Sequence, residues 1–154
     1  MSQPISEHTT PQELALAASQ AMWTRDNATH ALGMELISVT PGHAVLRMKV
    51  RPDMVNGHHI CHGGLIFTLA DSAFAYACNS YNLNTVASAC SIDFLAPGRE
   101  GEVLEATAVE RSASGRTGVY DVEVKVVGGH TVALFRGKSY RIKGEVIAGL
   151  EGQS

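Results

Sequence analysis

The sequence predicts an α+β protein in which a strongly curved antiparallel sheet wraps round one long central helix. The first observation behind this prediction is a nearly all-apolar segment from Leu65 to Cys78, which is typical of a helix inside a protein. The second is the strand-like runs on both sides of it, which short turns connect as antiparallel neighbours. With 154 residues the chain makes one domain, so the helix and strands must share a core. One sheet cannot cover the whole helix, so we also expect pairing with a second copy.

The chain begins with a helical extension that we assign to residues 1–32. Its first residues, up to Thr9, are polar and are expected to be loose. Thr10 is an N-cap candidate, followed by Pro11 at the first helical position and Glu13 three residues after the cap. The helix is expected to end near Arg25, with a short second helical turn after it.

The main domain is assigned to residues 33–142, and most of it reads as strands. Alternating apolar and polar residues and the turn pairs Pro41-Gly42 and Gly128-Gly129 define two hairpins. Residues 143–154 have no convincing period and are expected to form a flexible tail. The expected strands are Met34–Val39, His43–Arg51, Thr85–Leu95, Glu102–Arg111, Val119–Val127 and Thr131–Ile142.

Composition excludes several classes of function. The net charge of -3 gives no basic footprint for nucleic acid. Cys61, Cys78 and Cys90 are few, widely spaced and odd in number, and no secretory segment precedes them, so we expect a reducing, cytoplasmic setting. The most apolar segment is too short to span a membrane and carries an acid. We therefore predict no nucleic-acid or membrane partner.

Polar side chains are rare on the predicted central helix, and they share one stripe. Thr68, Asp71 and Ser72 are separated by three and four positions, with the small residues Gly64 and Ala75 one turn to either side. A buried carboxylate is costly unless it is paired or working. Asp71 is therefore either a reacting group or a structural acid hydrogen-bonded to a neighbouring loop.

The pair Gly63-Gly64 stands at the start of this helix. Unpaired backbone N–H groups and the positive end of the helix dipole gather there, and glycines let a substrate approach closely. Such a site suits a carbonyl oxygen that becomes negative during reaction. The alternative is that the two glycines only make a tight turn into the helix.

The loop before the helix, His58 to His62, contains potential metal ligands. They lie within one short segment, whereas a closed metal site draws ligands from two separated segments. We therefore predict no metal. Cys61 as a nucleophile would need a base and an orienting group, and no signature supports that role. The chain also lacks a P-loop, a dinucleotide-binding glycine pattern and a Gly-x-Ser-x-Gly elbow.

The stretch NGHHICHGGLIFTLADSAFAYACNS resembles the signature of hotdog-fold acyl-CoA thioesterases of the phenylacetate-degradation type, usually called PaaI. The likeness extends over roughly Gly33 to Ile142. The matching features are Asn56, His62-Gly63-Gly64, Phe67, Leu69-Ala70-Asp71, Ala73 to Asn79, Ser91 to Leu95 and Arg116 to Val122.

The resemblance implies hydrolysis of acyl-CoA thioesters in phenylacetate degradation, with ring-hydroxylated phenylacetyl-CoA or a related aryl-acyl-CoA as substrate. It makes Asp71 the general base or nucleophile and lets the Gly63 amide polarise the thioester carbonyl. Asn56 would orient the water or the carboxylate, and His62 would support the site. It also implies dimers of hotdogs, often paired into tetramers, with no metal or organic cofactor.

Spacing bears on the dimer independently of the resemblance. Gly63 and Asp71 are eight residues apart, about 12 Å along a helix. One helix cannot bring both groups to the same carbonyl carbon. If Gly63 is the electrophile and Asp71 the base, they come from different subunits, and each dimer has two sites.

Substrate-binding residues are harder to place from the sequence. Arg111, Ser112, Arg116 and Thr117 flank a turn between strands and suit the phosphates of CoA, although a solvated hairpin explains them equally well. Gly64 is expected to admit the substrate to the helix start. Phe67 and neighbouring residues such as Phe74 are expected in the acyl pocket.

Two other functions fit the same fold. A hotdog hydratase or dehydratase would need a histidine with an acidic partner at the acyl chain, and the predicted central helix has no histidine. A non-catalytic acyl-CoA-binding module would lack the acid or carry a DNA-binding domain, and neither feature is seen. Hydrolysis is therefore the favoured function.

Overall fold

The computed structural model describes residues 9–153, so part of the predicted loose N-terminal segment, residues 1–8, lies outside the described residues. The helices are α1 (Pro11–Arg25), α2 (Asn27–Ala31) and α3 (Gly63–Cys78), with a short 3-10 helix at Pro52–Met54. The strands are β1 (Glu35–Thr40), β2 (His43–Lys49), β3 (Leu83–Phe94), β4 (Val103–Ser114), β5 (Thr117–Val126) and β6 (Thr131–Glu145).

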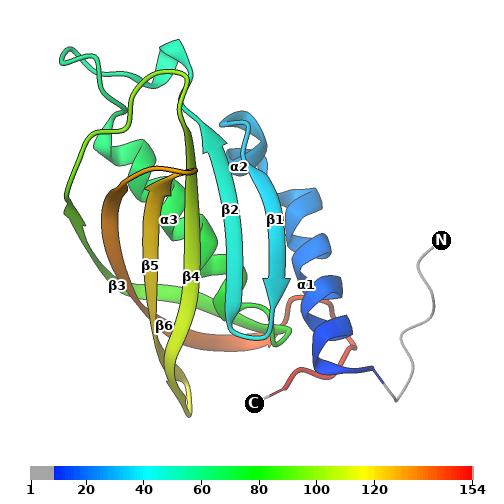
Figure 1. Ribbon diagram of the computed structural model, residues 1–154. Coiled ribbons are helices and arrows are strands. Elements are labelled where there is room, and N and C mark those ends of the chain that lie inside the picture. Colours follow the sequence, from blue (N-terminus) through cyan, green and yellow to red (C-terminus); the bar gives the residue numbers. More distant parts are fainter. Residues whose placement is uncertain (1–8, 154) are drawn as a thin grey trace.

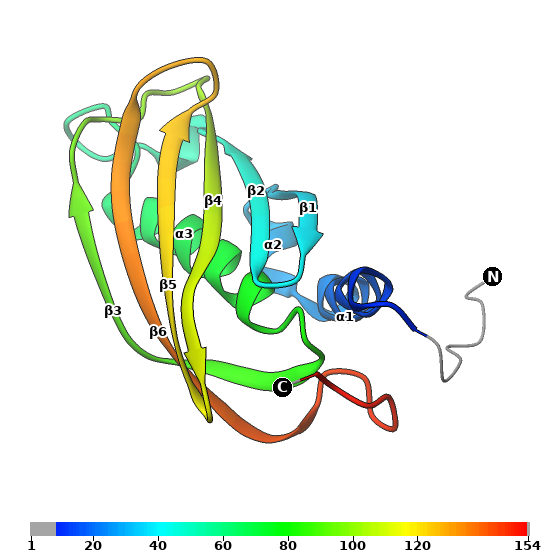
Figure 2. The same ribbon diagram turned by 60° about the horizontal axis from the view of Figure 1, so that its bottom comes forward.

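The strands form one antiparallel sheet that curves round α3 (Figures 1 and 2). Its strand order is β1-β2-β4-β5-β6-β3. The helix lies on the concave face, and the buried apolar side chains of the sheet and of α3 make a single core. The predicted α+β architecture is confirmed, including both hairpins, β1-β2 and β5-β6.

The N-terminal helix begins as its sequence predicts. Thr10 Oγ1 accepts a hydrogen bond from the Glu13 amide at 3.1 Å, and Asp26 caps α2 in the same way through the Thr29 amide. Helix α1 lies beside β1, where Gln12 donates to the Val39 carbonyl at 3.0 Å (Figure 1). The extension is thus fixed to the outer strand of the sheet.

Helix α3 presents most of its surface to the core, but one stripe stays partly open. Its buried residues are Ile66, Leu69, Ala70, Ala73, Phe74, Tyr76, Ala77 and Cys78. Thr68, Asp71, Ser72 and Ala75 are only partly buried and lie on the other side. We call these four residues, with Gly64, the open stripe of α3. One sheet therefore leaves uncovered the polar side of the helix that the sequence predicted.

The sheet ends on this side at β3, an edge strand that pairs only with β6 among the described residues. Much of β3 is exposed, and its apolar side chains Val86 and Phe94 are 46% and 54% exposed. A long edge with apolar side chains is a template for pairing with another strand.

The C-terminal segment, for which the sequence predicts a flexible tail, is hydrogen-bonded to the rest of the fold. Strand β6 continues past Ile142 to Glu145. Residues 146–153, which we call the C-terminal strap, then cross to the turn between α3 and β3. There the strap is hydrogen-bonded to the Asn82 side chain and to the Tyr81 carbonyl. A pattern search misses such a segment because these contacts depend on one buried amide and not on a period.

No helix among residues 9–153 is long and apolar enough to cross a membrane.

Candidate active site on the open stripe of α3

The three polar side chains of the open stripe have different surroundings. Thr68 Oγ1 donates to the Gly64 carbonyl at 2.8 Å, and Ser72 Oγ donates to the Thr68 carbonyl at 2.7 Å. Both hydroxyls are satisfied by their own helix. Asp71 has no hydrogen-bond or ion-pair partner among the described residues. Asp71 is therefore the one polar side chain of the stripe with no hydrogen-bond partner within residues 9–153.

Partial burial raises the pKa of the Asp71 carboxyl, because desolvation penalises its charged form. The charge of Asp71 in turn helps to raise the pKa of the Cys78 and Cys90 thiols, after the larger effect of their own burial. Asp71 thus lies close enough to Cys78 and to Cys90 of β3 to act on them electrostatically. A desolvated, unpaired carboxylate is a stronger proton acceptor than one in water.

The start of α3 offers one free backbone donor. His62 is the N-cap, and its Nδ1 accepts from the Gly64 amide at 3.0 Å. The Leu65 and Ile66 amides both donate to the His62 carbonyl. The Gly63 amide has no acceptor within residues 9–153. Three of the four first-turn amides are satisfied, and Gly63 alone keeps its N–H for a ligand.

The loop before the helix is held by Asn56. Its Oδ1 accepts from the His58 amide at 2.9 Å and from the Ile60 amide at 3.4 Å. Its Nδ2 has no partner among the described residues, so it remains a donor. Asn56 therefore shapes the loop with one end of its amide and keeps the other end available.

Gly63 and Asp71 both belong to α3, eight positions apart, or about 12 Å at the helical rise. The structure therefore places the free amide and the free carboxylate on one rigid element without bringing them together. Within one chain the two groups cannot meet at the same atom of a ligand.

Metal and thiol chemistry find no support at this site. Among residues 9–153, no three His, Cys, Asp or Glu side chains are grouped as a metal site would need. Cys61 is buried, and burial raises the pKa of its thiol to about 11, which disfavours the reactive thiolate.

The predicted substrate-binding residues separate into two places. Arg111 is paired with Asp121 at 3.0 Å, next to Arg136 on the outer face of the sheet. Ser112 is exposed, just past an irregularity in the pairing of β4 with β5. Arg116 and Thr117 lie instead on a cavity at the other end of α3 from Gly63. The turn does not gather the four residues, because Arg111 has a carboxylate partner of its own.

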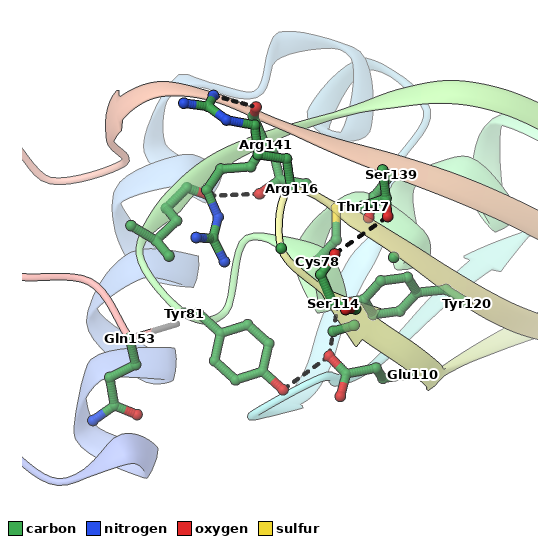
Figure 3. Close-up of a pocket in the computed structure, with 15 residues that line it drawn as sticks. Cys78, Tyr81, Glu110, Ser114, Arg116, Thr117, Tyr120, Ser139, Arg141 and Gln153 are labelled. Carbon is green, nitrogen blue, oxygen red and sulfur yellow. Dashed lines mark hydrogen bonds between the residues drawn. The ribbon is translucent and has the colours of Figure 1, made fainter.

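That cavity, of about 510 Å³, is lined by the β4-β5 hairpin, β6, the end of α3 and the strap (Figure 3). Arg116 and Arg141 bring two guanidinium groups to it, and Glu110 and Tyr81 line it nearby. We call it the hairpin pocket. Arg141, Glu110 and Tyr81 were not found from the sequence. They come from three distant segments, and no local pattern connects them.

Of the predicted acyl-pocket residues, Phe67 packs edge-on against Phe135 with ring centroids 5.4 Å apart. Phe74 is buried and fills the space above Gly137. Gly64 is exposed at the helix start. At Gly63 an added Cβ would lie 3.1 Å from Phe94 Cζ, so the Phe94 ring lies beside the free amide.

The fold and this site define a class of protein, and comparison with known families identifies it. Residues 58–133 match the Thioesterase superfamily. The chain is also 54% identical, over 128 residues, to acyl-coenzyme A thioesterase PaaI of Escherichia coli, covering 83% of this chain and 91% of that protein. The chain therefore belongs to the thioesterase superfamily.

Solved structures agree with this assignment. The Escherichia coli PaaI protein from the phenylacetic acid degradation operon has a TM-score of 0.87 at 51% identity, covering 88% of this chain and 99% of that one. The TT0310 protein of Thermus thermophilus has a TM-score of 0.74 at 43% identity, covering 77% of this chain and 99% of that one. A Streptococcus mutans protein solved with acetyl CoA has a TM-score of 0.68 at 26% identity, covering 71% of this chain and 88% of that one.

Proposed function

We propose that this chain hydrolyses acyl-CoA thioesters to the free acid and CoA, with a hydroxyphenylacetyl-CoA or related aryl-acyl-CoA as substrate in phenylacetate degradation. The observation that carries this proposal is the free, desolvated carboxylate of Asp71 on the same helix as the free amide of Gly63. The Escherichia coli relative, an acyl-coenzyme A thioesterase connected with phenylacetic acid degradation, supports the choice of reaction and pathway.

The reaction would use one half-site from each of two subunits. The Gly63 amide of one subunit donates to the thioester carbonyl oxygen and stabilises the negative charge that develops there. Asp71 of the other subunit takes a proton from water, whose oxygen attacks the carbonyl carbon. The C–S bond then breaks, and the proton passes to the CoA sulfur. Alternatively, the carboxylate attacks directly and water opens the resulting anhydride; both routes need the same groups.

Asn56 and His62 would support these steps. The free Nδ2 of Asn56 is a donor suited to orienting the water or the carboxylate. His62 Nδ1 holds the Gly64 amide, so the amide of Gly63 stays at a fixed helix start. We give His62 a positioning role.

We place the phosphates of CoA in the hairpin pocket, at Arg116, Thr117 and Arg141. Two guanidinium groups beside a threonine hydroxyl suit phosphate oxygens. Arg111 and Ser112 stay candidates only for a part of CoA that extends past the hairpin, since Arg111 already pairs with Asp121. Phe67 and Gly64 remain the proposed contacts of the acyl group.

A second copy of the chain is proposed to cover the open stripe. The stripe and the edge strand β3 are neighbours, since α3 packs against β3 and Asp71 acts electrostatically on Cys90 of that strand. Pairing of two β3 edges would continue the sheet and set the two α3 helices against each other. That arrangement gives two shared sites per dimer, with tetramers as a further step. The free thiols Cys61, Cys78 and Cys90 suit a reducing cytoplasm.

The deciding experiment is a thioester-cleavage assay over a panel of acyl-CoAs. Asp71→Asn is expected to lower kcat by at least ~100-fold, as for loss of a general base. Ser72→Ala is the matched control, because its hydroxyl is satisfied by the neighbouring turn of α3. Near-normal activity of Asp71→Asn would refute the mechanism. No cleavage by the wild-type chain, with CoA still bound, would make it a non-catalytic binding module.

A further inference from the structure

The C-terminal strap is anchored by one unusual residue, Asn82. This residue is 0% exposed and has φ of 62°, a left-handed conformation that asparagine tolerates. Its Oδ1 accepts from the Ile147 amide at 2.8 Å. Its Nδ2 donates to the Leu150 carbonyl at 2.8 Å and to the Ile147 carbonyl at 3.3 Å. The side-chain amide is thus used at both ends to hold the strap.

The far end of the strap docks closely on the same turn. The Gln153 amide donates to the Tyr81 carbonyl at 2.9 Å. At Gly152 an added Cβ would lie 2.4 Å from Leu83 Cδ2 and 3.0 Å from the Tyr81 carbonyl oxygen, so a larger residue requires Leu83 or the strap to move. The strap therefore contacts the residues on both sides of Asn82, namely Tyr81 and Leu83.

Tyr81 connects the strap to the hairpin pocket, because its carbonyl binds the strap and its side chain lines the pocket. Its hydroxyl donates to Glu110 Oε1 at 3.0 Å, and the Tyr120 hydroxyl donates to the same oxygen at 2.9 Å (Figure 3). Burial and the Glu110 carboxylate raise the pKa of Tyr81 to about 12, so the phenol keeps its proton. The phenol ring stands as a wall of the pocket between Glu110 and Gln153.

From these contacts we infer that the strap is a positioning element for acyl-CoA binding: it holds Tyr81 as a preformed wall of the pocket that takes the phosphate-bearing end of CoA. This inference rests on the proposed function. Without the strap the Tyr81 turn must be ordered when the ligand binds, which reduces affinity. Asp71 belongs to the open stripe and makes no contact with the strap, so the chemical step is left unchanged.

Two variants disrupt the strap, one by deleting it and one by displacing its end. One chain ends at Glu145, and the other carries Gly152→Val, which forces the strap end off Leu83 while Asn82 stays intact. Both are expected to raise KM for acyl-CoA about tenfold, equal to about 1.4 kcal/mol, with kcat within about twofold of wild type. Gln20→Val, exposed on α1, is the control and is expected to keep both constants.

Calorimetry with free CoA separates this inference from the function itself. Tenfold weaker CoA binding by both variants supports the strap's role, even if the wild type cleaves no thioester and hydrolysis is refuted. Normal cleavage with unchanged KM and CoA affinity in both variants overturns the strap's role and leaves hydrolysis standing. Absence of CoA binding by the wild type, or a fall in kcat alone, also overturns it.

Discussion

At the scale of single residues, the environment of each polar group decides which ones can react. Thr68 and Ser72 share the stripe with Asp71, but their hydroxyls are bonded to their own helix. Asp71 is left unpaired and partly desolvated. The spacing of these residues was readable from the sequence, and so was the alternative of a structural acid. That alternative requires a hydrogen-bond partner, and none of the described residues supplies one to Asp71.

The raised pKa of Asp71 predicts opposite effects on stability and activity. Since its pKa is higher in the folded chain than in the unfolded one, protonation favours folding. The stability from this group is full below the unfolded-state pKa and is lost as pH rises through the folded-state pKa. Asp71→Asn stays neutral, so we expect its Tm at pH 7 to exceed that of wild type by a few degrees, at roughly the usual scale for such changes.

Thermal unfolding at matched protein concentration checks this prediction. The gain should vanish near about pH 3, where the wild-type carboxyl is protonated too. In the proposed mechanism the carboxylate is the reactive form, so kcat of the wild type should fall as pH drops through the raised pKa of Asp71. If Asp71→Asn and the wild type had equal Tm values at pH 7 as well as at low pH, desolvation at Asp71 would have no energetic effect.

At the scale of elements, the start of α3 is the feature that prepares the site. The glycine pair and His62 were recognised from the sequence, but the capping role of His62 is seen only in the folded chain. Its Nδ1 satisfies Gly64, its carbonyl satisfies Leu65 and Ile66, and Gly63 is thereby left as the free donor. A side-chain cap depends on a rotamer, which no pattern of residue types specifies.

Removal of this cap is expected to destabilise the chain. His62→Ala should lower the free energy of unfolding by about 1 kcal/mol, the usual loss at an N-cap. His62→Asn is the matched control, because asparagine also accepts from first-turn amides and should retain most of the stability. Denaturant unfolding measures both. A loss as large in His62→Asn as in His62→Ala would show that the ring packs and does not cap.

At the scale of the whole molecule, the proposed mechanism requires a second subunit, because Gly63 and Asp71 lie about 12 Å apart along α3. Gly63→Pro tests this, because proline removes the amide hydrogen yet is favoured at the first helical position. His62 has φ of -58° and ψ of 130°, which suits a residue before proline. Gly63→Pro should lower kcat by about 100-fold, the scale for one oxyanion donor. Gly63→Ala keeps the amide, adds a Cβ against Phe94, and thus measures the steric part alone.

Mixing the two inactive variants gives the decisive outcome. A dimer of one Asp71→Asn and one Gly63→Pro subunit retains one site with an intact amide and an intact carboxylate. Co-folded in equal amounts, the pair should recover roughly a quarter of wild-type activity, since half of the dimers are mixed and each has one of two sites. Recovery of no activity above that of either variant would show that Gly63 and Asp71 of different subunits do not form a shared site.

The sequence by itself determined the elements and the positions of the candidate groups on α3. Periodicity placed the helices and strands within a few residues, and spacing put Asp71 on one stripe and separated it from Gly63. Tertiary structure decided the hairpin pocket and the strap. It joined Arg116 to Arg141, Tyr81 to Glu110, and Asn82 to residues 146–153. The physical reason is the distance along the chain over which each feature acts. Repeating patterns reflect burial along one helix or strand. A hydrogen bond between distant segments depends on how the whole sheet curves round its helix.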